Sequence, residues 1–136
     1  MAGTANSVIT SQSLKTAQCV CTTAKTTYND STGAVLLMTA GADGAVVYSV
    51  KAAPRASVTA THCQLYRSRD GGTTLYYING ATMGAQSLSN TAAFTVTDFG
   101  YTESIPLRLA ANERLYVGIG VTLSGGVVFD AQYEDL

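Results

Sequence analysis

The 136-residue chain has no tryptophan, one histidine and two prolines, and only 12% of its residues are charged. A lone histidine excludes zinc sites built from several imidazoles. The sequence also lacks the G-x-S-x-G motif, the phosphate loop and the glycine fingerprint of dinucleotide-binding folds. No sequence motif identifies a nucleophile or an acid that would act together with His62. The sequence therefore predicts a protein that is not an enzyme and that uses no metal or cofactor.

The low net charge bears on which kinds of binding partner are expected. The formal net charge is −1, so neither nucleic acid nor an anionic membrane is an expected partner. No apolar run reaches the roughly 20 residues of a membrane helix, and the first 20 residues lack the regions of a secretory signal. Soluble domains carry about 25% charged residues. The deficit favours a homo-oligomer; the alternative is a monomer covered by Thr, Ser, Asn and Gly.

Residues 105–121 predict a strand, a tight turn and a second strand, because apolar residues occupy every second position. The turn is expected at residues 110–113. A further turn at Ser124–Gly125–Gly126 leads to the apolar residues 127–129. Three successive strands joined by tight turns predict a meander with one apolar face, which a second sheet must cover.

The rest of the chain repeats this pattern of short apolar or alternating segments between turn residues. Further strands are expected at residues 17–27, 34–39, 45–53, 57–67, 74–78 and 93–99. A change of phase near Thr61–His62 predicts a bulge, or a strand that changes sheets. The chain is therefore expected to be all-β. We predict an extended N-terminal arm over residues 1–16 and one two-sheet antiparallel β-sandwich over residues 17–136, jelly-roll-like, with an immunoglobulin-like sandwich as the alternative.

Residues 79–91 are small and polar and are predicted to form a long loop, the best internal candidate for a contact surface. The contact residues expected in and beside it are Tyr76, Tyr77, Asn79, Met83 and Leu88. The chain has eight tyrosines, which keeps a carbohydrate-binding role open.

The three cysteines allow several states. Cys19 and Cys21 lie two apart, so a strand places both on one face, where a disulfide between them has poor geometry. Cys63 has the option of pairing with one of them, which leaves an odd thiol. Reduced thiols are the default in a cytosol. A disulfide formed after release, within the chain or between neighbouring subunits, is the alternative.

Four motifs carry a family resemblance: TAGADGAVV at 39–47, AAP at 52–54, Leu65–Tyr66 followed by DGG at 70–72, and PLRLAANERLYV at 106–117. The chain, over about residues 34–129, resembles small virion proteins of tailed bacteriophages. The resemblance implies a jelly-roll sandwich, often trimeric, that decorates or cements a capsid and has no catalytic residues.

From this resemblance we expect a capsid decoration protein that stabilises the phage head through oligomeric contacts. Its partners would be further copies of itself and the major capsid protein or other virion proteins. It would be made in the host cytoplasm and reside in the virion. The alternatives are a collar, tail fibre or baseplate component, and a carbohydrate-binding jelly-roll module.

Overall fold

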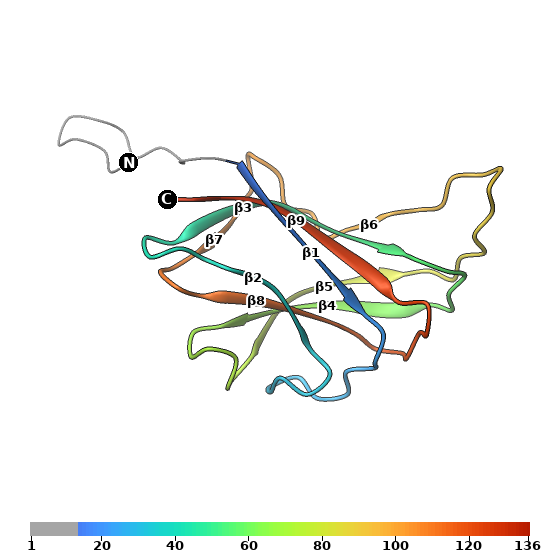
Figure 1. Ribbon diagram of the computed structural model, residues 1–136, viewed down its shortest axis with the longest axis horizontal. Coiled ribbons are helices and arrows are strands. Elements are labelled where there is room, and N and C mark those ends of the chain that lie inside the picture. Colours follow the sequence, from blue (N-terminus) through green and yellow to red (C-terminus); the bar gives the residue numbers. More distant parts are fainter. Residues whose placement is uncertain (1–13) are drawn as a thin grey trace.

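The computed structural model describes residues 14–136, which form two antiparallel β-sheets packed against each other (Figure 1). The predicted all-β sandwich is thereby confirmed. Most of the predicted N-terminal arm, residues 1–13, lies outside the described residues, whereas residues 14–16 belong to the first strand. The strands are β1 (Leu14–Cys21), β2 (Val35–Thr39), β3 (Ala45–Pro54), β4 (Thr61–Ser68), β5 (Tyr76–Met83), β6 (Thr97–Asp98), β7 (Leu107–Leu109), β8 (Arg114–Ile119) and β9 (Val127–Asp135).

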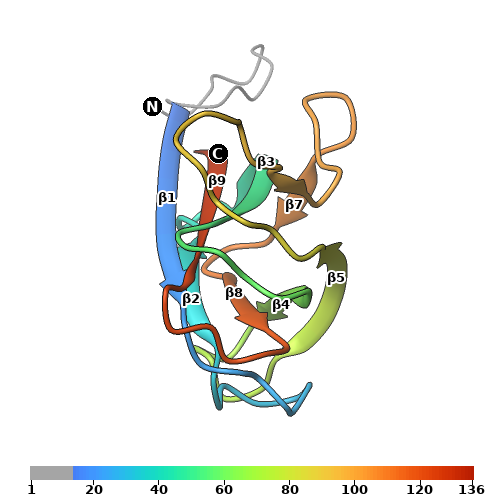
Figure 2. The same cartoon turned by 90° about the vertical axis from the view of Figure 1, so that its right-hand side faces the viewer.

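The strands pair in a nested order. Sheet A has the order β1-β9-β3-β6, with β7 also pairing with β3, and sheet B has the order β2-β8-β4-β5. The first strand therefore pairs with the last, β2 with β8, β3 with β7, and β4 with β5, all antiparallel. Figure 2, seen from one end of the molecule, shows the two layers with β1 and β5 on opposite sides.

The core lies between the sheets and is built from alternate residues of their strands. Sheet A contributes Val50 and Phe129 and sheet B contributes Leu65 and Val117, all with no exposed surface. Each such side chain contributes about 1.5–3 kcal/mol when removed from water. The alternation read from the sequence is thus the pattern of a sandwich interior.

The predicted meander over residues 105–129 is wrong, because these three strands do not pair with one another. β7 and β9 lie in sheet A, whereas β8 lies in sheet B between β2 and β4. The two turns occur where expected, with Asn112 at φ 60° and Gly126 at φ 83°, but each carries the chain from one sheet to the other. A hairpin turn and a turn between sheets need the same residues, so composition does not distinguish them.

β8 is buried on both faces, although one covered face was expected. Leu115, Val117 and Ile119 face the core, and Tyr116 on the opposite face packs with Tyr66 and Leu75 in a second cluster. The connection between β1 and β2 lies on that outer face and covers it, as its buried Lys25 side chain shows.

Several strand boundaries differ from the prediction. β1, expected at residues 17–27, spans Leu14–Cys21, and β9 continues from Val127 to Asp135. β4 begins at Thr61. The register shift lies between Leu65 and Tyr66 rather than at Thr61–His62, and the extra residue, Ile78, belongs to the neighbouring strand β5. β5 continues to Met83, so the expected loop from residue 79 starts later. Of the strand expected at 93–99, only β6 (Thr97–Asp98) forms, because Thr95 bonds to the side chain of Gln86 instead of to a strand.

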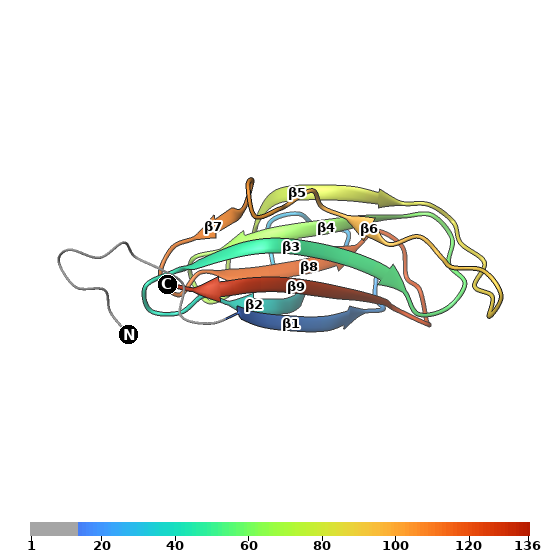
Figure 3. The same ribbon diagram turned by 90° about the horizontal axis from the view of Figure 1, so that it is seen from above.

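The connection between β5 and β6 projects from one end of the sandwich (Figure 3). The start of β1 and the C-terminus lie at the other end. Phe94 and Val96, which belong to this connection, are 43% and 49% exposed. The sandwich therefore presents an uncharged extension with exposed apolar side chains far from its chain ends.

Candidate functional site

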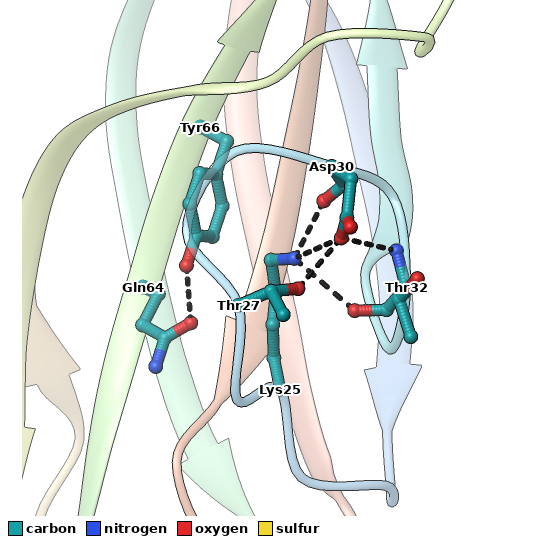
Figure 4. Close-up of polar contacts among 6 residues, drawn as sticks. All are labelled: Lys25, Thr27, Asp30, Thr32, Gln64 and Tyr66. Atoms are coloured by element: carbon teal, nitrogen blue, oxygen red, sulfur yellow. Dashed lines mark hydrogen bonds and ion pairs between the residues drawn. The ribbon is translucent and has the colours of Figure 1, made fainter.

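A buried lysine organises the outer face of sheet B (Figure 4). The Lys25 ammonium donates to the backbone carbonyls of Asp30 at 2.6 Å and Thr32 at 3.1 Å. Its Nζ atom lies 5.0 Å from the centroid of the Tyr66 ring, within the range of a cation–π contact. The side chain passes over Gly118, where a Cβ atom would lie 2.9 Å from Lys25 Cδ. Lys25 thus ties the β1–β2 connection to sheet B.

The turn held by Lys25 is closed by an aspartate. Asp30 Oδ1 accepts hydrogen bonds from the Thr27 hydroxyl at 2.6 Å and from the Thr32 amide at 3.1 Å, and these bonds lower the pKa of the carboxyl. Asp30 Oδ1 lies 3.7 Å from the ammonium. Burial lowers the pKa of Lys25, and the Asp30 carboxylate opposes that shift. With its protons directed to carbonyls, this lysine acts as a clamp rather than as a nucleophile.

Three aromatic residues lie next to this clamp. Tyr28 and Tyr77 meet edge to face, with ring centroids 6.2 Å apart and an interplanar angle of 82°. The Tyr77 hydroxyl is 2.6 Å from His62 Nε2. Tyr77 also meets the buried Tyr66 ring edge to face at 5.6 Å. We call Tyr28, Tyr77 and His62 the aromatic corner; it can stack on a ligand and exchange hydrogen bonds with it.

Gln64 lies beneath the aromatic corner and is incompletely bonded. Its Oε1 accepts a hydrogen bond from the Tyr66 hydroxyl at 2.5 Å, while its Nε2 is buried and has no partner. Figure 4 shows this nitrogen turned away from Tyr66. Residues two apart in a strand share a face, so Gln64 lies on the same face of β4 as His62. A buried donor without an acceptor is costly and calls for an explanation.

A second feature is a groove of about 400 Å³ at the side of the sandwich where β5 and β6 approach each other. Side-chain amides bridge the two layers at both of its ends. Asn79 Nδ2 donates to the Phe99 carbonyl at 3.0 Å, and the Gln86 side chain bonds both backbone groups of Thr95 at 2.9 Å. The groove is lined by Ala81, Thr82, Gly84, Ala85, Gln86, Thr95, Val96, Thr97 and Asp98.

The cysteines are all free thiols, which is the expected default, and the alternative of a disulfide within the chain is not observed. Cys21 and Cys63 are buried and Cys19 is half-buried. Burial raises the pKa of Cys63 to about 12. The neighbouring Cys21 lowers the pKa of Cys19, whereas Cys19 and burial raise the pKa of Cys21, whose thiol donates to the Val117 carbonyl at 3.7 Å. A bond to another subunit remains open to Cys19 only.

The expected contact residues do not form one surface. Tyr76 and Tyr77 are exposed, but only Tyr77 joins the aromatic corner, because Tyr76 lies instead beside Arg69. Met83 has no exposed surface, since β5 extends to it and directs its side chain into the core. Asn79 and Leu88 are half-buried.

Several residues of the site escaped the sequence analysis. Only the position of Lys25 before a turn distinguishes it in the sequence, so its burial could not be predicted. Gln64 has the sequence context of an ordinary polar residue in a strand. His62, for which the sequence shows no catalytic partner, lies on the outer face beside Tyr77.

Neither a metal site nor a membrane helix is found in the part of the chain that the structure describes. No group of three His, Cys, Asp or Glu side chains in residues 14–136 is placed to hold a metal ion. None of these residues belongs to a helix long and apolar enough to cross a membrane. In comparisons with known proteins, no family model, curated protein or solved structure matched this chain.

Proposed function

We propose that the protein is an assembly-forming structural component of a tailed-bacteriophage virion, a capsid decoration protein that works as an oligomer. The observation that carries this proposal is the projecting connection between β5 and β6. It belongs to a run of 27 residues, 71–97, without a single Asp, Glu, Lys, Arg or His. Uncharged surface with exposed apolar side chains favours contact with another protein.

Phe94 and Val96 are the anchors of this contact. Both are exposed, and burying an aromatic side chain at an interface removes a large apolar area from water. The nested pairing of β1 with β9, β2 with β8 and β4 with β5 supports the jelly-roll classification. We propose that the copies associate as a trimer and bind the major capsid protein through the projecting connection.

The oligomeric state and the position on the particle test this proposal. Sedimentation velocity of the purified protein should give a trimer, and electron cryo-microscopy of the phage that encodes it should place the trimers on the capsid. The variant Phe94→Ser should weaken trimer formation or capsid binding. Ile105→Ser is the matched control, because Ile105 is 69% exposed in a different loop.

Two results would contradict the proposal. A monomer that fails to bind particles would remove the structural role. Localisation to the collar, fibre or baseplate would keep the virion role and replace the capsid assignment.

A further inference from the structure

The aromatic corner has the parts of a small-ligand site. Tyr28 is 54% exposed and Tyr77 is 42% exposed, and their rings stand nearly perpendicular to each other. Two such rings form adjoining walls, and each offers a flat apolar face to a ring-shaped ligand. A ligand stacked on either ring removes apolar area of both partners from water.

Hydrogen-bonding groups line the same place. The Tyr77 hydroxyl and His62 Nε2 lie over Gly80, because a Cβ atom at Gly80 would overlap both of them. Gly80 is the cross-strand partner of Gln64, whose buried Nε2 has no hydrogen-bond partner. The Tyr77 hydroxyl and the His62 ring nitrogen can exchange hydrogen bonds with a hydroxyl-bearing ligand, directly or through a bridging water.

The corner is held in place before any ligand arrives. Tyr28 lies between Lys25 and Asp30, and the Lys25 bonds to the carbonyls of Asp30 and Thr32 secure the connection that carries it. The amide of Leu75 also donates to the carbonyl of Asn29 at 3.1 Å. A rigid site loses less conformational entropy when it binds.

The charges near the corner indicate the type of ligand. The Lys25 ammonium is buried and donates to backbone carbonyls, and the half-exposed Asp30 carboxylate beside it accepts bonds from Thr27 and Thr32. The Arg69 guanidinium lies over Tyr76. Residues 71–97, which include all of β5, contain no charged residue. From stacking faces, hydroxyl-directed donors and little free charge, we infer that Tyr28, Tyr77 and His62 bind a neutral saccharide. This inference does not depend on the capsid role.

Binding is tested with the full chain on an array of neutral glycans, followed by titration of each bound glycan with NMR detection. We expect at least one neutral glycan to bind and to shift the signals of Tyr28, Tyr77 and His62. Tyr77→Ala should lower the affinity about tenfold, since it removes one wall. Tyr77→Phe keeps the ring and should retain most of the affinity.

Tyr76→Ala is the matched control, because Tyr76 is the neighbouring residue of the same strand and is 49% exposed. It should bind like the unaltered protein. Melting curves of all variants show whether they are folded. An array without any bound neutral glycan would overturn the inference, and so would equal affinities of folded Tyr77→Ala and Tyr76→Ala variants.

Discussion

The side chain of Gln86 pairs with the backbone of Thr95 as a strand would. Its Nε2 donates to the Thr95 carbonyl and its Oε1 accepts the Thr95 amide, both at 2.9 Å. The backbone of Gln86 meanwhile pairs with Val58 through two bonds of 2.9 Å. One residue therefore ties the base of the projecting connection to the sandwich on two sides.

Replacing Gln86 by Ala should loosen the projecting connection without unfolding the core. Two exposed hydrogen bonds are lost, so the free energy of unfolding should fall by about 1 kcal/mol. Hydrogen exchange of the Thr95 amide should accelerate. Gln132→Ala on the exposed face of β9 is the control and should leave that exchange unchanged; equal rates in the two variants would contradict the role of Gln86.

Replacing Lys25 by Met should release the β1–β2 connection. Met fills a similar volume, but the carbonyls of Asp30 and Thr32 lose their donor, at a cost of about 1–3 kcal/mol. Chemical denaturation measures the loss. Lys51→Met, at an exposed position of β3, should have little effect. A Lys25→Met protein as stable as the original would show that packing alone holds the connection.

Asp70 should make stability sensitive to acid. Its Oδ1 accepts the Thr74 amide and the Ser68 hydroxyl at 3.0 Å, and these bonds lower the pKa of the carboxyl below its usual value of 3.8. The folded form therefore holds its proton less tightly than the unfolded chain. This contribution is complete above pH 3.8 and is lost as the pH falls through the folded pKa.

Asp70→Asn tests this assignment by denaturation at a series of pH values. The variant should show a smaller decrease of stability below pH 3.8 than the original protein. Asp43→Asn, at another exposed turn, should keep the full decrease. Parallel curves for the original and Asp70→Asn proteins would exclude Asp70 as a source of acid sensitivity.

The thiols should differ in reactivity. A thiol reagent at pH 8 should modify Cys19 first, because Cys21 and Cys63 are buried and their pKa values are raised. Cys19→Ser should abolish the fast phase and any disulfide-linked dimer on a non-reducing gel. A linked dimer that persists in Cys19→Ser would mean that a buried thiol becomes accessible.

The two glycines of the Asp70–Gly71–Gly72 turn should respond differently to Ala. Both have positive φ, 75° and 100°, so each substitution strains the backbone by about 1 kcal/mol. At Gly72 the new Cβ would also overlap the Tyr116 hydroxyl, whereas Gly71 has open space around it. Melting temperatures should therefore fall further for Gly72→Ala; equal losses would show that Tyr116 moves aside.

The sequence alone was sufficient for the class of fold. Period-2 alternation in segments such as Ala45–Pro54, ended by turn residues, identifies strands because neighbouring side chains point to opposite faces. The same local rules located the turns at Asn112 and Gly126. They depend on residues close together in the chain, so they can be read without knowledge of the pairing.

Tertiary structure alone decided which strands pair and what covers the sheets. The sequence around β7, β8 and β9 is compatible with a meander, and only long-range packing places β8 in the other sheet. Lys25, Tyr28 and Tyr77 come together because the β1–β2 connection lies across sheet B. Contacts between residues about 50 apart leave no local pattern, so the site could be found only from the folded chain.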